Sequence, residues 1–141
     1  VYHLPEDVVH VSYRYYWDDW GIKSSTVDLT YRLQLGAHVY LEPHYRYYTQ
    51  TAANFFTHSI VAGNVPDYAS ADLRLTALQS NTAGLRFAHQ LDSGSEWGLG
   101  VDYMNQTGDA HPASAIGVQK TEALFTDLKT MSVTADFSMK F

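Results

Sequence analysis

The chain has 141 residues, a formal net charge of −6 at pH 7 and no cysteine. The length suits one domain, the acidic balance argues against nucleic acid, and the lack of cysteine excludes disulfides and thiolate metal sites. No run approaches the roughly 18 apolar residues of a membrane-spanning helix, and a signal peptide for export would lie outside these residues. The eleven Tyr and three Trp are typical of surfaces that meet both dry and wet surroundings.

Six segments alternate apolar and polar side chains with a period of two, which predicts β-strands. In chain order the predicted strands cover residues 8–18, 24–34, 38–49, 79–91, 96–106 and 128–141. Their lengths are close to the roughly 9–11 residues of a tilted membrane-spanning strand and exceed the roughly 5–6 of a typical soluble strand. Pro43 cannot donate to the ladder and predicts a bulge or a local break in pairing.

The connections alternate between tight turns and long loops. Residues 34–37 and 92–95 predict tight turns, whereas residues 50–78 and 107–127 predict long loops. This asymmetry is typical of outer-membrane barrels. The predicted fold is all-β: residues 1–141 form the C-terminal part of one transmembrane antiparallel up-and-down β-barrel, a fragment of about six strands with short periplasmic turns and long extracellular loops. Because six strands do not close a single-chain barrel, we expect further strands N-terminal to this sequence; the alternative is that several copies share one barrel.

The last predicted strand ends on an aromatic residue. Its alternate residues Phe137, Met139 and Phe141 resemble the C-terminal signal that the barrel-assembly machinery reads in outer-membrane proteins. The resemblance places the C-terminus in the periplasm, and both long loops then lie outside the cell. It implies a location in the bacterial outer membrane, in contact with membrane lipid and lipopolysaccharide.

One face of the predicted strands is apolar and the other is polar. We expect the apolar face to meet lipid through an aromatic girdle formed by Tyr13, Tyr15, Trp17, Tyr45, Tyr47, Trp97, Tyr103 and Phe137. We expect the polar face to carry a mixed-sign charge ladder along a lumen, formed by Arg14, Asp28, Arg32, Glu42, His44, Arg46, Arg86, Asp102 and Asp136. The ladder either stabilises the wall, or filters ions and polar solutes, or receives a partner protein. A soluble β-sandwich would show the same alternation, and a soluble sandwich or lipocalin-like barrel is the alternative fold.

Hairpin pairing predicts which charges meet. Three neighbouring sets are expected: Arg14 with Asp28, Asp28 with Glu42 or His44, and Arg86 with Asp102. Ser12 and His10 stand two residues apart on one strand face, about 7 Å from each other and too far for a nucleophile–base hydrogen bond. No histidine spacing typical of a metal site occurs. We therefore predict no catalytic residue, metal or cofactor, and no enzyme activity.

The motif Tyr-Arg-Tyr-Tyr occurs at residues 13–16 and again at 45–48, within the longer segments 12–22 and 44–56. Together with residues 68–75, these segments resemble the C-terminal part of the domain-of-unknown-function 3570 family, and the resemblance covers most of the chain. It implies an outer-membrane protein of several hundred residues in Gram-negative bacteria, without a known activity. Members are often encoded beside thioredoxin-like proteins and a flavin-transferring enzyme, which implies a redox context.

The predicted function is a passive pore or a membrane scaffold with a mixed-charge polar lumen. The alternative is a barrel sleeve that holds a periplasmic or extracellular redox partner, a cytochrome or flavoprotein, for electron transfer across the outer membrane. An outer-membrane enzyme is a distant third hypothesis.

Overall fold

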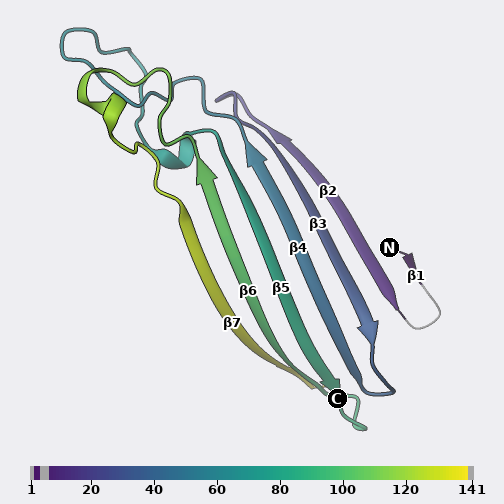
Figure 1. Cartoon of the computed structure of the whole chain (residues 1–141). Helices are drawn as coiled ribbons and strands as arrows, with labels where there is room; N and C mark the ends of the chain where they lie inside the picture. The colour runs from purple at the N-terminus through teal and green to yellow at the C-terminus, as the bar shows by residue number, and fades with distance from the viewer. Residues whose placement is uncertain (1, 4–6, 140–141) are drawn as a thin grey trace.

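A computed structural model describes residues 2–3 and 7–139, so Phe141 of the predicted assembly signal lies outside the described residues. Seven antiparallel strands form one sheet in which chain neighbours are also neighbours in space (Figure 1). They are β1 (Tyr2–His3), β2 (Val8–Trp17), β3 (Lys23–Gln34), β4 (Val39–Gln50), β5 (Leu78–Gln90), β6 (Glu96–Gly108) and β7 (Leu128–Ser138). Two short 3₁₀-helices, η1 (Leu73–Leu75) and η2 (Gly117–Thr121), lie in the long loops.

The prediction of an all-β, up-and-down antiparallel sheet with six long strands is confirmed. The two-residue strand β1 was not predicted, because two residues carry no periodicity. The sheet is open, since β7 pairs only with β6 among the described strands. No helix within residues 2–3 and 7–139 is long and apolar enough to cross a membrane.

The strand ends differ from the predicted ends by only a few residues, for local reasons. β2 ends at Trp17 because Asp18 forms the following turn, where its carboxylate accepts a hydrogen bond from the Ile22 N–H at 2.9 Å. Gly21 completes this turn with a φ of +82°, a conformation that favours glycine. β6 continues to Gly108, which pairs with the first residue of β5. The two long loops therefore comprise residues 51–77 and 109–127.

The predicted break at Pro43 is confirmed. The β3–β4 ladder pairs Thr30 with His44 and resumes, in the same register, at Leu33 with Leu41. The described ladder contains no β3–β4 pair between these two points. Proline has no N–H to donate toward β3, whereas the β4–β5 ladder on the other side continues without interruption.

The two faces of the sheet differ in chemistry and in exposure. In β2–β7 the odd-numbered residues form the apolar face and the even-numbered residues form the polar face. The most buried strand side chains lie on the polar face, where Thr26, Tyr40 and Ala88 are 2%, 4% and 0% exposed. On the apolar face Tyr13 and Val133 are 65% and 66% exposed. A soluble sheet shows the reverse, because its apolar face packs against a core.

The three connections opposite the tight turns pack together as a loop cap, formed by residues 18–22, 51–77 and 109–127 and gathered at the upper left of Figure 1. The first loop meets the second where the Asn54 N–H donates to the Trp20 carbonyl at 2.8 Å. The second loop meets the third where the Gln119 side chain hydrogen-bonds the Ser59 hydroxyl and the His58 carbonyl. The long loops therefore form a folded layer over one end of the sheet.

Candidate functional site on the polar face

Tyr40 is the centre of an ion-pair network on the polar face, near the tight turns. Its hydroxyl donates to Glu96 Oε1 at 2.6 Å and accepts from Arg86 Nη1 at 2.8 Å. The Arg32 guanidinium lies 4.2 Å from the centroid of its ring, within the range of cation–π attraction. Side chains from β3, β5 and β6 thus converge on one buried phenol of β4.

Arg86 joins Tyr40 to two carboxylates. Its Nη2 donates to Glu96 Oε1 at 2.9 Å, and its Nε and Nη2 donate to the two oxygens of Asp136 at 3.1 and 2.6 Å. Bidentate pairing of this kind fixes the orientation of a guanidinium as well as its position. A second pair joins Arg32 Nε to Glu42 at 2.6 Å. We name these residues the tyrosine cluster: Arg32, Tyr40, Glu42, Arg86, Glu96 and Asp136.

A glycine makes room for this network. A Cβ added to Gly98 would stand 2.5 Å from Arg86 Nη2 and 2.7 Å from Asp136 Oδ1, closer than real Cβ contacts. The same addition at Gly100, two residues along β6, would meet nothing nearer than 3.8 Å. The absent side chain at Gly98 therefore lets the guanidinium lie flat across the sheet and reach β7.

A second group of charges, the histidine cluster, comprises Asp28, His44, Arg46 and Asp102. His44 Nε2 lies 3.4 Å from Asp28, and its Nδ1 lies 3.7 Å from Asp102. Arg46 Nε lies 3.8 Å from Asp28. The imidazole thus stands between two carboxylates from β3 and β6. A Cβ at Gly84 would overlap the Asp102 carboxylate, so this cluster also needs a glycine in the strand opposite.

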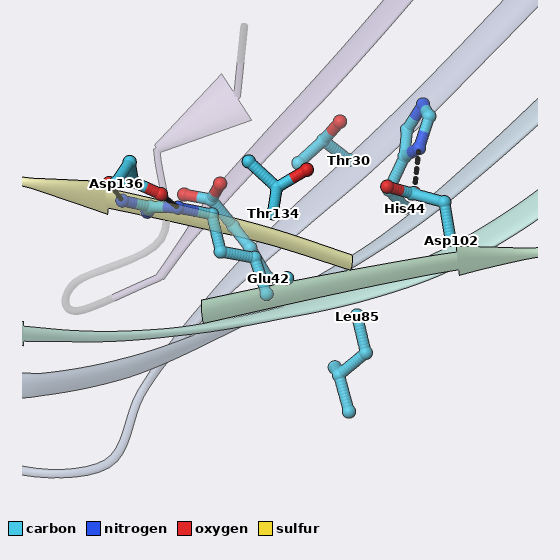
Figure 2. Close-up of a pocket in the computed structure, with 9 residues that line it drawn as sticks. Thr30, Glu42, His44, Leu85, Asp102, Thr134 and Asp136 are labelled. Carbon is cyan, nitrogen blue, oxygen red and sulfur yellow. Dashed lines mark hydrogen bonds and ion pairs between the residues drawn. The ribbon is translucent and has the colours of Figure 1, made fainter. Parts of the chain in front are cut away.

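A hollow of about 250 Å³ separates the two clusters. Figure 2 shows carboxylates and hydroxyls from several strands around it, with a dashed line between His44 and Asp102. The lining residues include Thr30, Glu42, His44, Asp102, Thr134 and Asp136. Carboxylate, imidazole and hydroxyl groups can receive water, ions or small polar solutes by hydrogen bonding.

The predicted charges lie on one face of the sheet, but some of their ion pairs differ from those expected. Arg14 stands opposite Thr26 and diagonally from Asp28, so these two charges are near neighbours as expected. Asp28 meets His44, the second of its two expected partners, whereas Glu42 pairs with Arg32.

Arg86 lies near Asp102 as expected, but its ion pairs within the described residues go to other carboxylates. It stands opposite Gly100, and Asp102 stands opposite Gly84, so Asp102 is only its diagonal neighbour. The ion pairs of Arg86 go to Glu96 and Asp136 instead. The interaction with Asp136 is possible because Gly98 leaves the intervening strand without a side chain at that point.

Tyr40 and Glu96 were missed as members of the site. A tyrosine on a strand rich in aromatic residues gives no signal that distinguishes it from its neighbours. The available signal was the pair of polar-face glycines Gly84 and Gly98, because glycine inside a strand indicates close approach of another group.

The aromatic residues predicted for the girdle lie on the apolar face, since all are odd-numbered members of β2–β7. Toward the loop cap this face becomes polar, and tyrosine hydroxyls donate hydrogen bonds to the polar side chains there. Tyr45 donates to Asn81 Oδ1 at 2.7 Å, and Tyr47 donates to Gln79 Oε1 at 3.3 Å. The rings of these tyrosines lie over the apolar part of the face, and their hydroxyls reach a row of polar side chains. The tyrosines therefore mark the boundary between the apolar and the polar part of this face.

Fold and site together define an open antiparallel sheet with an exposed apolar face and an ion-paired polar face. Within the described residues, no group of three or more His, Asp or Glu side chains could hold a metal ion. Over residues 1–141 the sequence matches the model of the family described as "Protein of unknown function (DUF3570)", and the chain belongs to that family. No curated protein matches the chain. No solved structure matches it either.

Proposed function

We propose that this chain forms part of the wall of a transmembrane β-barrel in a Gram-negative outer membrane, and that the barrel is a passive pore for small polar solutes. The single observation that carries the proposal is the inverted exposure of the sheet. Many large side chains of its apolar face are exposed, whereas its most buried strand side chains and its ion pairs lie on the polar face. Lipid on one side and a water-filled lumen on the other would satisfy both faces.

The dimensions of the apolar face support this arrangement. On β4 the apolar face runs from Val39 to Tyr47, which at about 3.3 Å per residue is about 26 Å along the strand. A barrel strand tilted by roughly 40° would cover about 20 Å of bilayer with it, close to the apolar band of about 25 Å in known barrels. The polar row at Asn81 and Gln79 would then lie at the outer interface.

The polar face would line the lumen with charges of both signs. Four arginines (Arg14, Arg32, Arg46 and Arg86) stand among five carboxylates (Asp28, Glu42, Glu96, Asp102 and Asp136). Because the two signs nearly balance and most members are paired, we expect passage of small polar solutes with weak preference for ion charge. The hollow beside His44 would give such solutes hydrogen-bonding partners.

The orientation follows from the loops. Short turns join β3 to β4 and β5 to β6, and the loop cap lies at the other end. In outer-membrane barrels the long loops are extracellular, so we place the loop cap outside and the C-terminus in the periplasm. The free edge of β7 cannot face lipid unpaired, so the barrel requires further strands, from a longer chain or from additional copies.

Two measurements test the proposal. A folded barrel migrates faster than its boiled form on a detergent gel, so a protein that shows no shift and dissolves without detergent would refute the barrel. In a planar bilayer we expect discrete conductance steps, and Arg46→Ala should shift selectivity toward cations. Lys129→Ala, which removes one positive charge from the apolar face, is the matched control and should leave selectivity unchanged. A folded barrel without conductance would refute the pore and leave a scaffold.

A further inference from the structure

The loop cap contains an aromatic pocket that is separate from both polar-face clusters. It is a hollow of about 360 Å³ lined by Trp20, Phe55, Asp67, Tyr68 and Ala69. This volume lies within the roughly 300–1,000 Å³ of small-molecule sites. The side chains of Trp20 and Tyr68 are 51% and 84% exposed. Two large aromatic rings are thus exposed to solvent around a hollow, an arrangement typical of a ligand-binding site.

Contacts within the loop cap hold two of the aromatic walls, Trp20 and Phe55, against each other. Trp20 and Phe55 meet edge to face, with ring centroids 5.4 Å apart and ring planes at 72°, so they form a corner rather than one flat platform. The backbone ties the corner to the rest of the pocket, because the Ser70 N–H donates to the Phe55 carbonyl at 3.0 Å. The Asn54 N–H in turn holds the Trp20 carbonyl. Two loops that are distant in the sequence therefore present their rings together.

We propose that this pocket binds an organic cation that carries a quaternary ammonium group. The faces of indole and phenol rings are electron-rich and attract cations within about 6 Å. Asp67 adds a full negative charge at the same hollow. A quaternary ammonium group has no N–H, so it needs no hydrogen-bond acceptor. That property matches a lining of three aromatic side chains, one alanine and one carboxylate.

The charge of the loop cap favours the same ligand class. Its three loops carry seven Asp or Glu residues against two Lys or Arg, a formal charge of −5 with histidine neutral. One of the two bases, Arg74, is already paired with Asp72 at 2.6 Å. Such a field raises the local concentration of cations and repels anions. A sugar would instead require several polar side chains for its hydroxyls, and this pocket offers only Asp67.

Choline chloride titrated into the purified protein, with calorimetry and tryptophan fluorescence as readouts, tests the inference. We expect a dissociation constant in the millimolar range, because each exposed cation–π contact contributes little. The neutral isostere 3,3-dimethylbutan-1-ol should bind at least about fivefold more weakly. Tyr68→Ala should weaken choline binding about two- to fivefold, as expected for one cation–π contact, whereas Tyr68→Phe should retain it.

Asp67→Asn should also weaken choline binding, and Asp19→Asn is its matched control, since Asp19 belongs to the same cap but does not line the pocket. All four substitutions involve exposed side chains, and the gel mobility of each folded variant checks that the protein is intact. The inference is overturned if the wild-type protein does not bind choline, if the neutral isostere binds equally well, if both Asp variants behave alike, or if methyl glucoside binds in place of choline. None of these outcomes depends on conductance, so the pore is tested separately.

Discussion

Replacing Tyr40 by phenylalanine should destabilise the folded protein by about 2 kcal/mol. The substitution keeps the ring, so the Arg32 guanidinium retains its contact, but it removes the hydroxyl that bonds Glu96 and Arg86. Each hydrogen bond to a charged group contributes about 1.5–3 kcal/mol. The sum is reduced because Glu96 and Arg86 still bind each other at 2.9 Å and are 21% and 26% exposed, so water recovers part of the loss.

Urea unfolding in detergent micelles, followed by tryptophan fluorescence, measures this effect. Tyr48→Phe is the matched control on the same strand and face, because the Tyr48 hydroxyl donates only to the neutral side chain of Gln50 at 2.7 Å. Its cost should stay near 1 kcal/mol or below. If Tyr40→Phe costs no more than Tyr48→Phe, the tyrosine cluster does not stabilise the sheet as described. A double-mutant cycle with Glu96→Gln should show coupling.

Three further predictions concern the faces, the glycines and the loop cap. Leu29→Lys on the apolar face should impair assembly, at a cost of about 2–4 kcal/mol, whereas Thr30→Lys should be tolerated better; equal gel-monitored folding yields would remove the face assignment. Gly98→Ala should lower the urea midpoint by displacing Arg86, and Gly100→Ala should not; the reverse order would contradict the network. Hydrogen bonds from Arg74 lower the pKa of Asp72 from 3.8 to about 2, so this pairing stabilises the turn above about pH 4 and is lost as the pH falls through 2; an NMR titration midpoint near 3.8 would disprove it.

The strands were predictable because their signal is local. The alternation of apolar and polar side chains is a property of consecutive residues. It therefore shows where a strand begins and ends and on which face each side chain lies. Pro43 was predictable for the same reason, since the missing N–H belongs to the residue itself. Among the strands that the structure describes, only the two-residue β1 carries no such pattern.

The ion-pair partners of Arg32 and Arg86 were not predictable, because they depend on register and on reach across the sheet. Expected neighbours such as Arg86 and Asp102 lie one diagonal step apart, and a long guanidinium then selects among several carboxylates. Arg86 reaches Asp136 on a strand two places away only because Gly98 leaves the path open. The aromatic pocket of the loop cap was not predictable for a similar reason, since Trp20 and Phe55 belong to different loops and meet only in the folded structure.

The sequence by itself determined the strands, the turns and the two faces of this protein. These properties follow from side-chain alternation and from residues that limit the backbone, which act over a few neighbouring positions. Only the tertiary structure decided that Tyr40 is buried among charges, that His44 stands between two carboxylates and that the long loops fold into a cap. Those contacts join residues far apart in the chain, and only the pairing of whole strands brings them within hydrogen-bonding distance.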